Sequence, residues 1–308
     1  MRWTEADWLA EATEWIREQV EVTGEIAQPH VQHWSTVLEV PTAEEKVWFK
    51  AVPSIHAFEP SLTALLARLQ PGRVPDVLAV DADRAWMLMR DGGTRLRDLP
   101  ATVEHWEHLL PGYAELQIAV TPYANQLLAL GVSDLRLEVL PGELEDLAGD
   151  HPELLERLPE ATELMEQLAA HGIPATVQHD DLHDGQVFVR DGRYRVLDWG
   201  DACVSHPFHT LTVTLRAATW RLGLEPGGTD VLRMRDAYLE PFGRPAELAP
   251  IADAAYRTGT LARALAWRRY LAARKSDTTD DADEDAVGYG VRRFLEDGPI
   301  GTWEDDGL

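Results

Sequence analysis

Hydrophobic residues recur every three or four positions along the first 20 residues, which is the spacing of one face of an α-helix. Thr4 and Asp7 fit a capping box at the start of this predicted helix. The segments 30–40 and 46–52 are rich in Val, Trp and Phe, a composition typical of strands. Because the turn-like sequence PTAEE separates them, they predict an antiparallel hairpin.

The pattern changes twice more before residue 92. Leucines spaced three and four residues apart predict a helix over 60–69. Two apolar runs within 74–89 flank a cluster of turn-forming acids and predict a second pair of strands. Gly92 and Gly93 follow as a natural hinge. We therefore expect residues 1–91 to form a small strand-rich lobe.

From residue 92 onward the pattern is mainly helical, with apolar residues three or four positions apart in several segments. The exception is a pair of short apolar runs, 186–190 and 194–199, separated by the turn sequence at 191–193. This arrangement is typical of a tight β-hairpin. The whole pattern predicts an α+β protein with a larger, mainly helical lobe over 92–308.

Composition limits the class of protein. A chain of 308 residues that is 45% hydrophobic can bury a large core. No apolar run approaches the roughly 20 residues of a transmembrane helix, and Glu5 and Asp7 interrupt any signal sequence. Cys203 is the single cysteine, which excludes an internal disulfide. We expect a cytoplasmic protein without a membrane partner.

The chain carries 53 acidic and 28 basic residues, a formal charge of -25. Phosphate backbones would be repelled by this charge, so we expect no nucleic-acid partner. The acidity would favour a cationic ligand, but it is spread along the whole chain and is equally consistent with solubility alone. The acidic run at 277–285 is predicted to be a solvated loop. The oligomeric state is left open.

Two acidic residues flank the predicted hairpin. Asp181 precedes its first strand, and Asp198 ends its second strand. Because the strands of a tight hairpin run side by side, we expect these two carboxylates to converge at one edge. Gln186 opens the first strand and adds an amide oxygen, and such oxygens are the ligands that Mg²⁺ prefers. An interpretation as turn residues alone explains neither the joint spacing nor the nearby histidines.

The stretch HDDLHDGQ at 179–186, followed by VLDWG at 196–200, resembles the catalytic segment of the aminoglycoside phosphotransferase and choline kinase family. That family has the pattern His-Gly-Asp-Leu-His-x-x-Asn, a hairpin, and then two apolar residues before Asp-Trp or Asp-Phe, and the spacing agrees. The resemblance implies a two-lobed protein kinase-like fold. It also implies an ATP-dependent phosphotransferase that requires Mg²⁺ and acts on a hydroxyl of a small molecule, with GTP as the alternative nucleotide.

The resemblance implies a role for each matching residue. Asp181 would orient the acceptor hydroxyl and accept its proton as the catalytic base, and Asp198 and Gln186 would hold Mg²⁺. Lys50, at the end of a predicted strand, would contact the α and β phosphates. Glu59 would pair with Lys50 or, alternatively, cap its own helix. Residues 1–91 would then bind the nucleotide, while 92–308 would carry the catalytic loop and the acceptor site.

The remaining nucleotide contacts depart from the family pattern, because the chain has no Gly-rich phosphate loop. Ser35 and Thr36 would have to cover the phosphates, and Trp34 fits either that loop or the core. Met89 lies in the predicted strand that leads to the hinge, where the adenine would bind. Gln186 replaces the family's Asn, so a nucleotide-binding pseudoenzyme without turnover is the alternative function.

The acceptor is not identified by the sequence. Asp180, Asp184 and Asp201 would favour an amine-bearing acceptor such as an aminoglycoside, amino sugar or amino alcohol, whereas Arg268 and Arg269 would suit an anionic one. Asp180 also stands where the family has glycine. Its backbone therefore either avoids a positive φ or adopts one that Asp tolerates.

Overall fold

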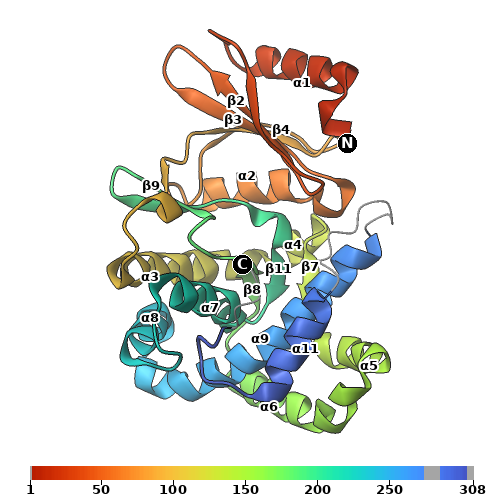
Figure 1. Cartoon of the computed structure of the whole chain (residues 1–308), viewed down its shortest axis with the longest axis vertical. Coiled ribbons are helices and arrows are strands. Elements are labelled where there is room, and N and C mark those ends of the chain that lie inside the picture. The colour runs from red at the N-terminus through yellow and green to blue at the C-terminus, as the bar shows by residue number, and fades with distance from the viewer. Residues whose placement is uncertain (1, 274–284, 304–308) are drawn as a thin grey trace. The chain divides into compact units, whose positions relative to one another are not determined.

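The computed structural model of the chain describes residues 2–273 and 285–303 and divides into two compact units (Figure 1). Unit 1 consists of Met1–Arg95 and Val187–Gly200, and unit 2 consists of Leu96–Gln186 and Asp201–Leu308. Unit 1 is rich in antiparallel strands, and unit 2 is mainly helical. The α+β class predicted from the sequence is therefore confirmed.

Unit 1 contains a five-stranded antiparallel sheet in the order β1-β2-β3-β5-β4 and a three-stranded sheet in the order β10-β9-β6. Its elements are α1 (Ala6–Gln19), β1 (Ala27–Val31), β2 (Thr36–Pro41), β3 (Lys46–Ala51), α2 (Glu59–Leu69), β4 (Val77–Asp81), β5 (Trp86–Arg90), β6 (Thr94–Arg95), β9 (Val187–Arg190) and β10 (Arg193–Val196). The predicted hairpin of 30–40 with 46–52 needs one correction, because the first segment bends at 32–35 and supplies both β1 and β2.

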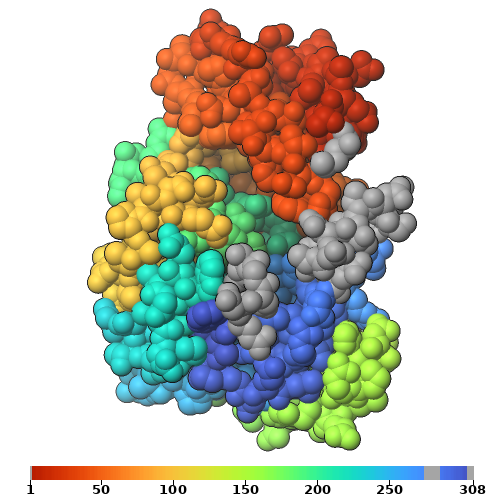
Figure 2. Space-filling view, viewed as in Figure 1, coloured from red at the N-terminus to blue at the C-terminus, as the bar shows by residue number. Residues whose placement is uncertain are grey.

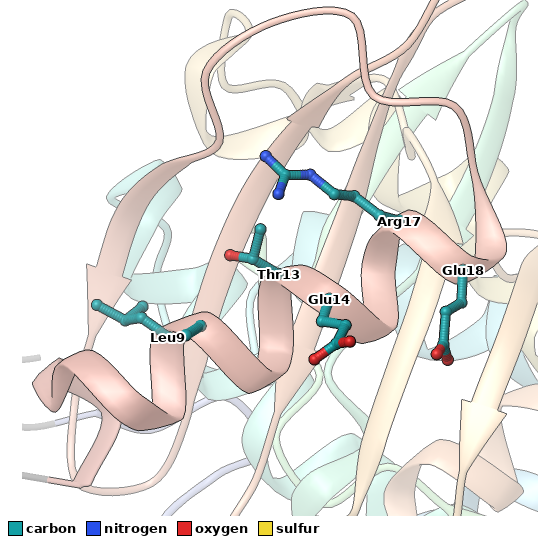
Figure 3. Close-up of a pocket in the computed structure, with 6 residues that line it drawn as sticks. Leu9, Thr13, Glu14, Arg17 and Glu18 are labelled. Atoms are coloured by element: carbon teal, nitrogen blue, oxygen red, sulfur yellow. The ribbon is translucent and has the colours of Figure 1, made fainter.

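One face of the five-stranded sheet packs against α1. Trp8 and Trp15 from α1 contact Phe49 and Trp86, with ring centroids 5.7–6.2 Å apart. Trp8 and Phe49 are tilted relative to each other, and the other pairs meet edge-on. Alternate strand residues point to this face, so they form a buried aromatic and aliphatic core. The helix begins at Ala6, and its N-cap residue is Glu5 rather than the predicted Thr4. Figure 3 shows residues of α1 that line a surface pocket, among them the half-buried Leu9 and the exposed Arg17.

The hairpin of β9 and β10 joins unit 1 although it is distant from the other strands in the sequence. Asp191 and Gly192 both have positive φ, 54° and 71°, as the two central residues of a tight hairpin turn require. Arg190 pairs directly with Arg193, so the connection has two residues. Thr94 and Arg95 of β6 pair with β9 and add a third strand.

Unit 2 also contains a three-stranded sheet, in the order β7-β11-β8. Its elements are α3 (Val103–Val120), α4 (Ala124–Ala129), β7 (Ser133–Leu135), α5 (Leu140–Asp150), α6 (Leu158–Ala170), β8 (Thr176–Gln178), β11 (Cys203–Ser205), α7 (Thr210–Leu222), α8 (Thr229–Leu239), α9 (Pro245–Ala273) and α11 (Ala286–Glu296). The sequence analysis missed this sheet, because each of its strands has only three residues and shows no clear alternation.

The core of unit 2 is built around α9. Leu261 and Leu265 of α9 are buried with Val291 and Phe294 of α11, whose outer surface is visible in dark blue in Figure 2. No helix of the described residues is long and apolar enough to cross a membrane. The acidic run predicted at 277–285 lies outside the described residues, except for Asp285.

Candidate functional site

Lys50 lies on the face of the five-stranded sheet that is turned away from α1. Its neighbours Phe49 and Ala51 point into the aromatic core, so strand alternation directs Lys50 to the opposite side. Its ammonium Nζ donates to Glu59 Oε1 at 2.6 Å and to Asp198 Oδ1 at 2.6 Å. Lys50 and Glu59, which the sequence assigned to the nucleotide, and Asp198, which it assigned to the metal, are therefore in contact within unit 1.

Glu59 is the first residue of α2 and is fully buried. Its Oε1 also accepts a hydrogen bond from the backbone N–H of Trp199 at 3.1 Å. Phe58 is the N-cap residue of α2, and it makes no side-chain cap bond. Of the two alternatives for Glu59, the structure shows the pairing with Lys50.

The charge of Lys50 is stabilised by its surroundings. Burial by itself would lower the pKa of the Lys50 ammonium, but the carboxylates of Asp198 and Glu59 outweigh burial and raise it. Lys50 is therefore a fixed cation at neutral pH. A fixed cation of this kind suits contact with phosphate oxygens.

Asp198 differs from Lys50 in exposure. Its side chain is 40% exposed, whereas that of Lys50 is 7% exposed. It lies two residues beyond the end of β10, rather than in the strand as predicted, and has φ of +64°. Positive φ is uncommon for a residue other than glycine and re-aims the side chain at the strand end.

Ser35 ends the turn between β1 and β2, and Thr36 is the first residue of β2. The Thr36 hydroxyl donates to the carbonyl of His30 at 2.8 Å and accepts from Gln28 Nε2 at 2.9 Å. Ser35 Oγ lies 3.2 Å from His30 Nε2. Thr36 thus holds the turn together, while Ser35 contacts an imidazole. Met89 is buried in β5, opposite Trp48.

In unit 2, Asp181 follows β8 in a loop that is held by backbone hydrogen bonds. The backbone N–H of Asp181 donates to His179 Nδ1 at 3.2 Å, and the backbone N–H of His179 donates to the Tyr113 hydroxyl at 2.9 Å. Both His179 and Tyr113 are buried. These contacts fix the direction of the loop without using the Asp181 carboxylate.

The Asp181 carboxylate is surrounded by donors. His183 Nε2 lies 3.4 Å from Oδ2, the Gln186 amide donates to Oδ2 at 3.2 Å, and Arg263 donates to Oδ1 at 3.4 Å. Burial by itself would raise the pKa of Asp181, but His183 and Arg263 outweigh burial and hold the pKa below its usual range. Asp181 is therefore a carboxylate at neutral pH. Because the Gln186 nitrogen is bonded to Asp181, the amide oxygen is the atom that Gln186 would offer to a metal.

Asp180 adopts φ of +64°, so the second of the two alternatives holds: Asp takes the backbone conformation that favours glycine. The side chain is buried, with Oδ1 accepting from Gln178 Nε2 at 3.2 Å and Oδ2 accepting from Arg263 at 3.1 Å. Burial raises the pKa of the Asp180 carboxyl to about 7, although Arg263 opposes this rise.

Arg263 is a residue that the sequence analysis missed. It projects from α9, and its guanidinium contacts Asp180, Asp181 and, at 3.5 Å, Asp201. It also lies over the ring of Trp267, 5.2 Å from the centroid. The four-residue spacing from Arg263 to Trp267 was the signal that would have placed both on one helix face.

The charged residues assigned to acceptor binding are mostly paired within unit 2. Asp184 is buried and accepts from Arg97 Nε at 2.9 Å and Arg221 Nε at 3.2 Å. Asp180 and Asp201 share Arg263, as described above. Arg268 pairs with Asp150 at 2.7 Å, and Arg269 pairs with Glu143 at 3.2 Å. Neither the acidic nor the basic set therefore stands as an uncompensated cluster.

A magnesium ion was expected at this site. Within the described residues, no group of three or more His, Cys, Asp and Glu side chains is arranged to hold a metal ion. The predicted donors are one carboxylate, Asp198 in unit 1, and one amide, Gln186 in unit 2. Both supply hard oxygens, and Mg²⁺ in phosphoryl-transfer sites takes its other ligands from phosphates and water. Each of these two oxygens, taken by itself, is of the kind that Mg²⁺ prefers.

Comparisons with known proteins support the same class of molecule. A family model described as the phosphotransferase enzyme family matches residues 35–251. No curated protein matches the chain in sequence.

Solved structures with a similar fold include three enzymes that act on small molecules or bind a nucleotide. An ethanolamine kinase of Plasmodium vivax has a TM-score of 0.66 and 11% identity, covering 96% of this chain and 89% of its own. An amicoumacin kinase in complex with AMP-PNP and Ca²⁺ has a TM-score of 0.66 and 11% identity, covering 98% and 96%. An aminoglycoside 2'-phosphotransferase-IIIa mutant in its GDP complex has a TM-score of 0.59 and 15% identity, covering 94% and 96%. The predicted protein kinase-like fold is confirmed by these similarities.

Proposed function

The chain belongs to the phosphotransferase enzyme family, and we propose that it transfers the γ-phosphate of ATP to a hydroxyl group of a small molecule. The predictions of the family and of a phosphotransferase enzyme are confirmed by the family match. The observation that carries the finer proposal is the buried ion pair of Lys50 with Glu59, joined by Asp198. This arrangement presents a fixed cation beside a partly exposed carboxylate, as a nucleotide and its metal require.

Lys50 would contact the α and β phosphates, and Glu59 would hold Lys50 in place. Asp198 and Gln186 would hold Mg²⁺, which neutralises charge on the β and γ phosphates when bound. In this proposal residues 1–91 bind the nucleotide, and 92–308 supply the catalytic loop and the acceptor site. A structurally similar kinase was solved with AMP-PNP and Ca²⁺, which supports ATP and a divalent cation. GTP remains the alternative nucleotide, since another similar enzyme was solved with GDP.

Asp181 would receive the acceptor hydroxyl. The hydroxyl oxygen forms a bond to the γ-phosphorus, the bond from that phosphorus to the β–γ bridging oxygen breaks, and ADP leaves. The hydroxyl proton passes to the Asp181 carboxylate. Because the pKa of Asp181 is held below its usual range, this carboxylate is a weak base. Its main contribution would be to orient the hydroxyl, with proton transfer late in the reaction.

Amine-bearing acceptors remain the first set to test, because the similar solved structures include an ethanolamine kinase and an aminoglycoside phosphotransferase. The acceptor candidates are therefore an aminoglycoside, an amino sugar or an amino alcohol. The pairing of Asp180, Asp184 and Asp201 with arginines leaves less negative charge than the sequence suggested. Neutral hydroxyl compounds belong in the same screen.

The proposal is tested by measuring ADP release from Mg-ATP across a panel of amino and neutral hydroxyl compounds. Replacement of Asp181 by Asn keeps the shape of the side chain but removes its charge and basicity. We expect Asp181→Asn to lower turnover by about 100-fold or more while Mg-ATP binding persists.

Gln186→Asn is the matched variant, because it restores the amide that the resembling family carries. We expect Gln186→Asn to retain or increase turnover. The alternative function, a nucleotide-binding pseudoenzyme, would be supported by a thermal shift with ATP but no ADP release from wild type or Gln186→Asn with any acceptor.

A further inference from the structure

The sheet face that carries Lys50 also carries a histidine. His30 on β1 lies opposite Val37 on β2, and Val37 lies opposite Lys50 on β3. Residues directly opposite each other on neighbouring antiparallel strands point to the same face. His30, Val37 and Lys50 therefore form one row across three strands, on the side away from the α1 core. None of the roles assigned above uses His30.

The imidazole of His30 is held in a defined position. Its Nε2 lies 3.2 Å from Ser35 Oγ, and its backbone carbonyl accepts from the Thr36 hydroxyl at 2.8 Å. Ser35 and Thr36 are both buried, so the contacts tie the end of β1 to the start of β2. A side chain fixed in this way loses little further freedom when it binds a ligand.

The charge state of His30 also reflects the neighbouring ion pair. Burial lowers the pKa of His30, while the charges of Asp198 and Lys50 act on it in opposite directions. His30 is therefore close enough to this pair to respond to both charges. A neutral imidazole retains one N–H donor, which is suited to a phosphate oxygen.

The turn beside His30 lacks the usual means of binding phosphate. In a glycine-rich loop the absence of Cβ atoms lets backbone N–H groups approach the phosphates closely. Residues 31–36 contain no glycine, and the Thr36 hydroxyl is engaged within the turn. Donors from side chains are then needed in place of backbone amides.

We propose that His30, oriented by Ser35, is a nucleotide-binding residue that donates a hydrogen bond to the phosphate chain. The inference rests on the proposed function, because it assumes that the nucleotide binds beside Lys50. It adds a phosphate contact that the resemblance to the known family did not assign. It also gives Ser35 a supporting role, through the imidazole that its hydroxyl contacts.

The test compares dissociation constants of the full chain for Mg-ATP and for adenosine, measured by titration calorimetry. His30→Leu replaces the imidazole with an apolar side chain of similar size and so removes the hydrogen bond. His30→Gln replaces it with an amide that can still donate a hydrogen bond. Gln32→Leu is the matched control, because Gln32 is an exposed residue of the same turn. Thermal melting of each variant verifies that it is folded.

We expect His30→Leu to weaken Mg-ATP binding by about 10-fold or more, with adenosine binding unchanged. His30→Gln should weaken Mg-ATP binding less than His30→Leu does, and Ser35→Ala should weaken it by an intermediate factor. Gln32→Leu should bind Mg-ATP as the wild type does. Equal Mg-ATP binding by wild type and His30→Leu would overturn the inference and leave the proposed function intact. If His30→Leu weakened adenosine binding as much as Mg-ATP binding, the proposed contact of His30 with the phosphates would be overturned. Wild type that binds no nucleotide at all would overturn both.

Discussion

At the scale of single residues, the loop after β8 contains one carboxyl group whose charge is set by burial. Asp180 is buried beside Asp181 and Asp201, and these three carboxyl groups share the guanidinium of Arg263. Burial is the main cause of the raised pKa, because it disfavours the charged form of Asp180; the charges of Asp201 and Asp181 add to this effect, and Arg263 opposes it. Together they raise the pKa of the Asp180 carboxyl to about 7.

The free energy of unfolding should therefore depend on pH through the ionisation of Asp180. An acid with a raised pKa in the folded state binds its proton more tightly there than in the unfolded chain, whose Asp pKa is near 3.8. The folded state therefore loses stability as pH rises from about 4 to about 7. In Asp180→Asn the new side chain stays neutral at every pH and tolerates a positive φ. This variant should therefore not lose stability through position 180 as pH rises.

We expect the unfolding free energy of Asp180→Asn minus that of wild type to increase from pH 4 to pH 7 and then to level off. The slope of this difference against pH is at most about 1.4 kcal/mol per pH unit. Urea unfolding of both proteins at a series of pH values measures the difference. A difference that stays flat or falls over this range would show that Asp180 is ionised throughout in the folded protein.

Prediction from the sequence was strongest for residues that share a local motif. Asp181, Gln186 and Asp198 could be selected because their spacing along the chain is fixed by a loop and a hairpin. Arg263 could not be selected in the same way, since it lies 82 residues after Asp181. Only the folding of α9 against the loop after β8 brings the Arg263 guanidinium to Asp180 and Asp181.

At the scale of elements, α9 and α7 approach each other closely at Gly259. A Cβ added there would lie 2.1 Å from Thr212 Oγ1 and 3.4 Å from the Cα of His209. Gly259 is buried, and Thr212 Oγ1 donates to the Tyr256 carbonyl of α9 at 3.1 Å. The glycine therefore allows the two helices to pack at this point.

We expect Gly259→Ala to destabilise the protein by about 1–3 kcal/mol through overpacking. The matched control is Gly142→Ala in α5, where an added Cβ meets nothing within 4 Å. Because alanine favours a helix more than glycine does, this control should be neutral or stabilise by about 0.5–1 kcal/mol.

Chemical denaturation of both variants measures the difference. The double variant Thr212→Ala, Gly259→Ala should recover part of the lost stability, since it removes the nearest clashing atom. Equal effects of the two single glycine variants would contradict the close packing of α7 and α9.

Elements with a strong local pattern were predicted well. The first helix and the helix at 60–69 correspond to α1 and α2, because an apolar stripe at helical spacing must be buried. The strands β7, β8 and β11 were missed. They are three residues long, and β7 pairs in parallel with β11, about 70 residues away. Such strands are specified by their partners rather than by their own sequence.

At the scale of the whole molecule, unit 1 is assembled from two distant parts of the chain. Glu59 accepts hydrogen bonds from Lys50 and from the backbone of Trp199, which is 140 residues away. The carbonyl of Arg73 accepts from the backbone N–H of Val196 at 2.8 Å. The hairpin and the segment after it are therefore attached to α2 and to the loop between α2 and β4 by specific bonds.

If Mg-ATP binds beside Lys50, both parts of unit 1 should respond together. We expect Mg-ATP to slow amide hydrogen exchange in 27–51 and also in 187–200, because ligand binding opposes local opening. Adenosine is the control ligand, and it should protect 196–200 less, since it has no phosphates to engage Asp198 with a metal. Hydrogen exchange with mass spectrometry measures both. Protection of 27–51 without 187–200 would contradict a nucleotide site that includes Asp198.

The sequence by itself determined the class of the protein, its α+β organisation and the motif from His179 to Gly200, because these depend on spacing along the chain. The tertiary structure decided which groups meet and what charge they carry. It paired Glu59 with Lys50, gave Asp180 its positive φ, and placed Arg263 among three carboxylates. It also placed His30 in one row with Lys50 through the register of three strands. The physical reason is that burial and long-range ion pairing arise only from packing, which local patterns do not encode.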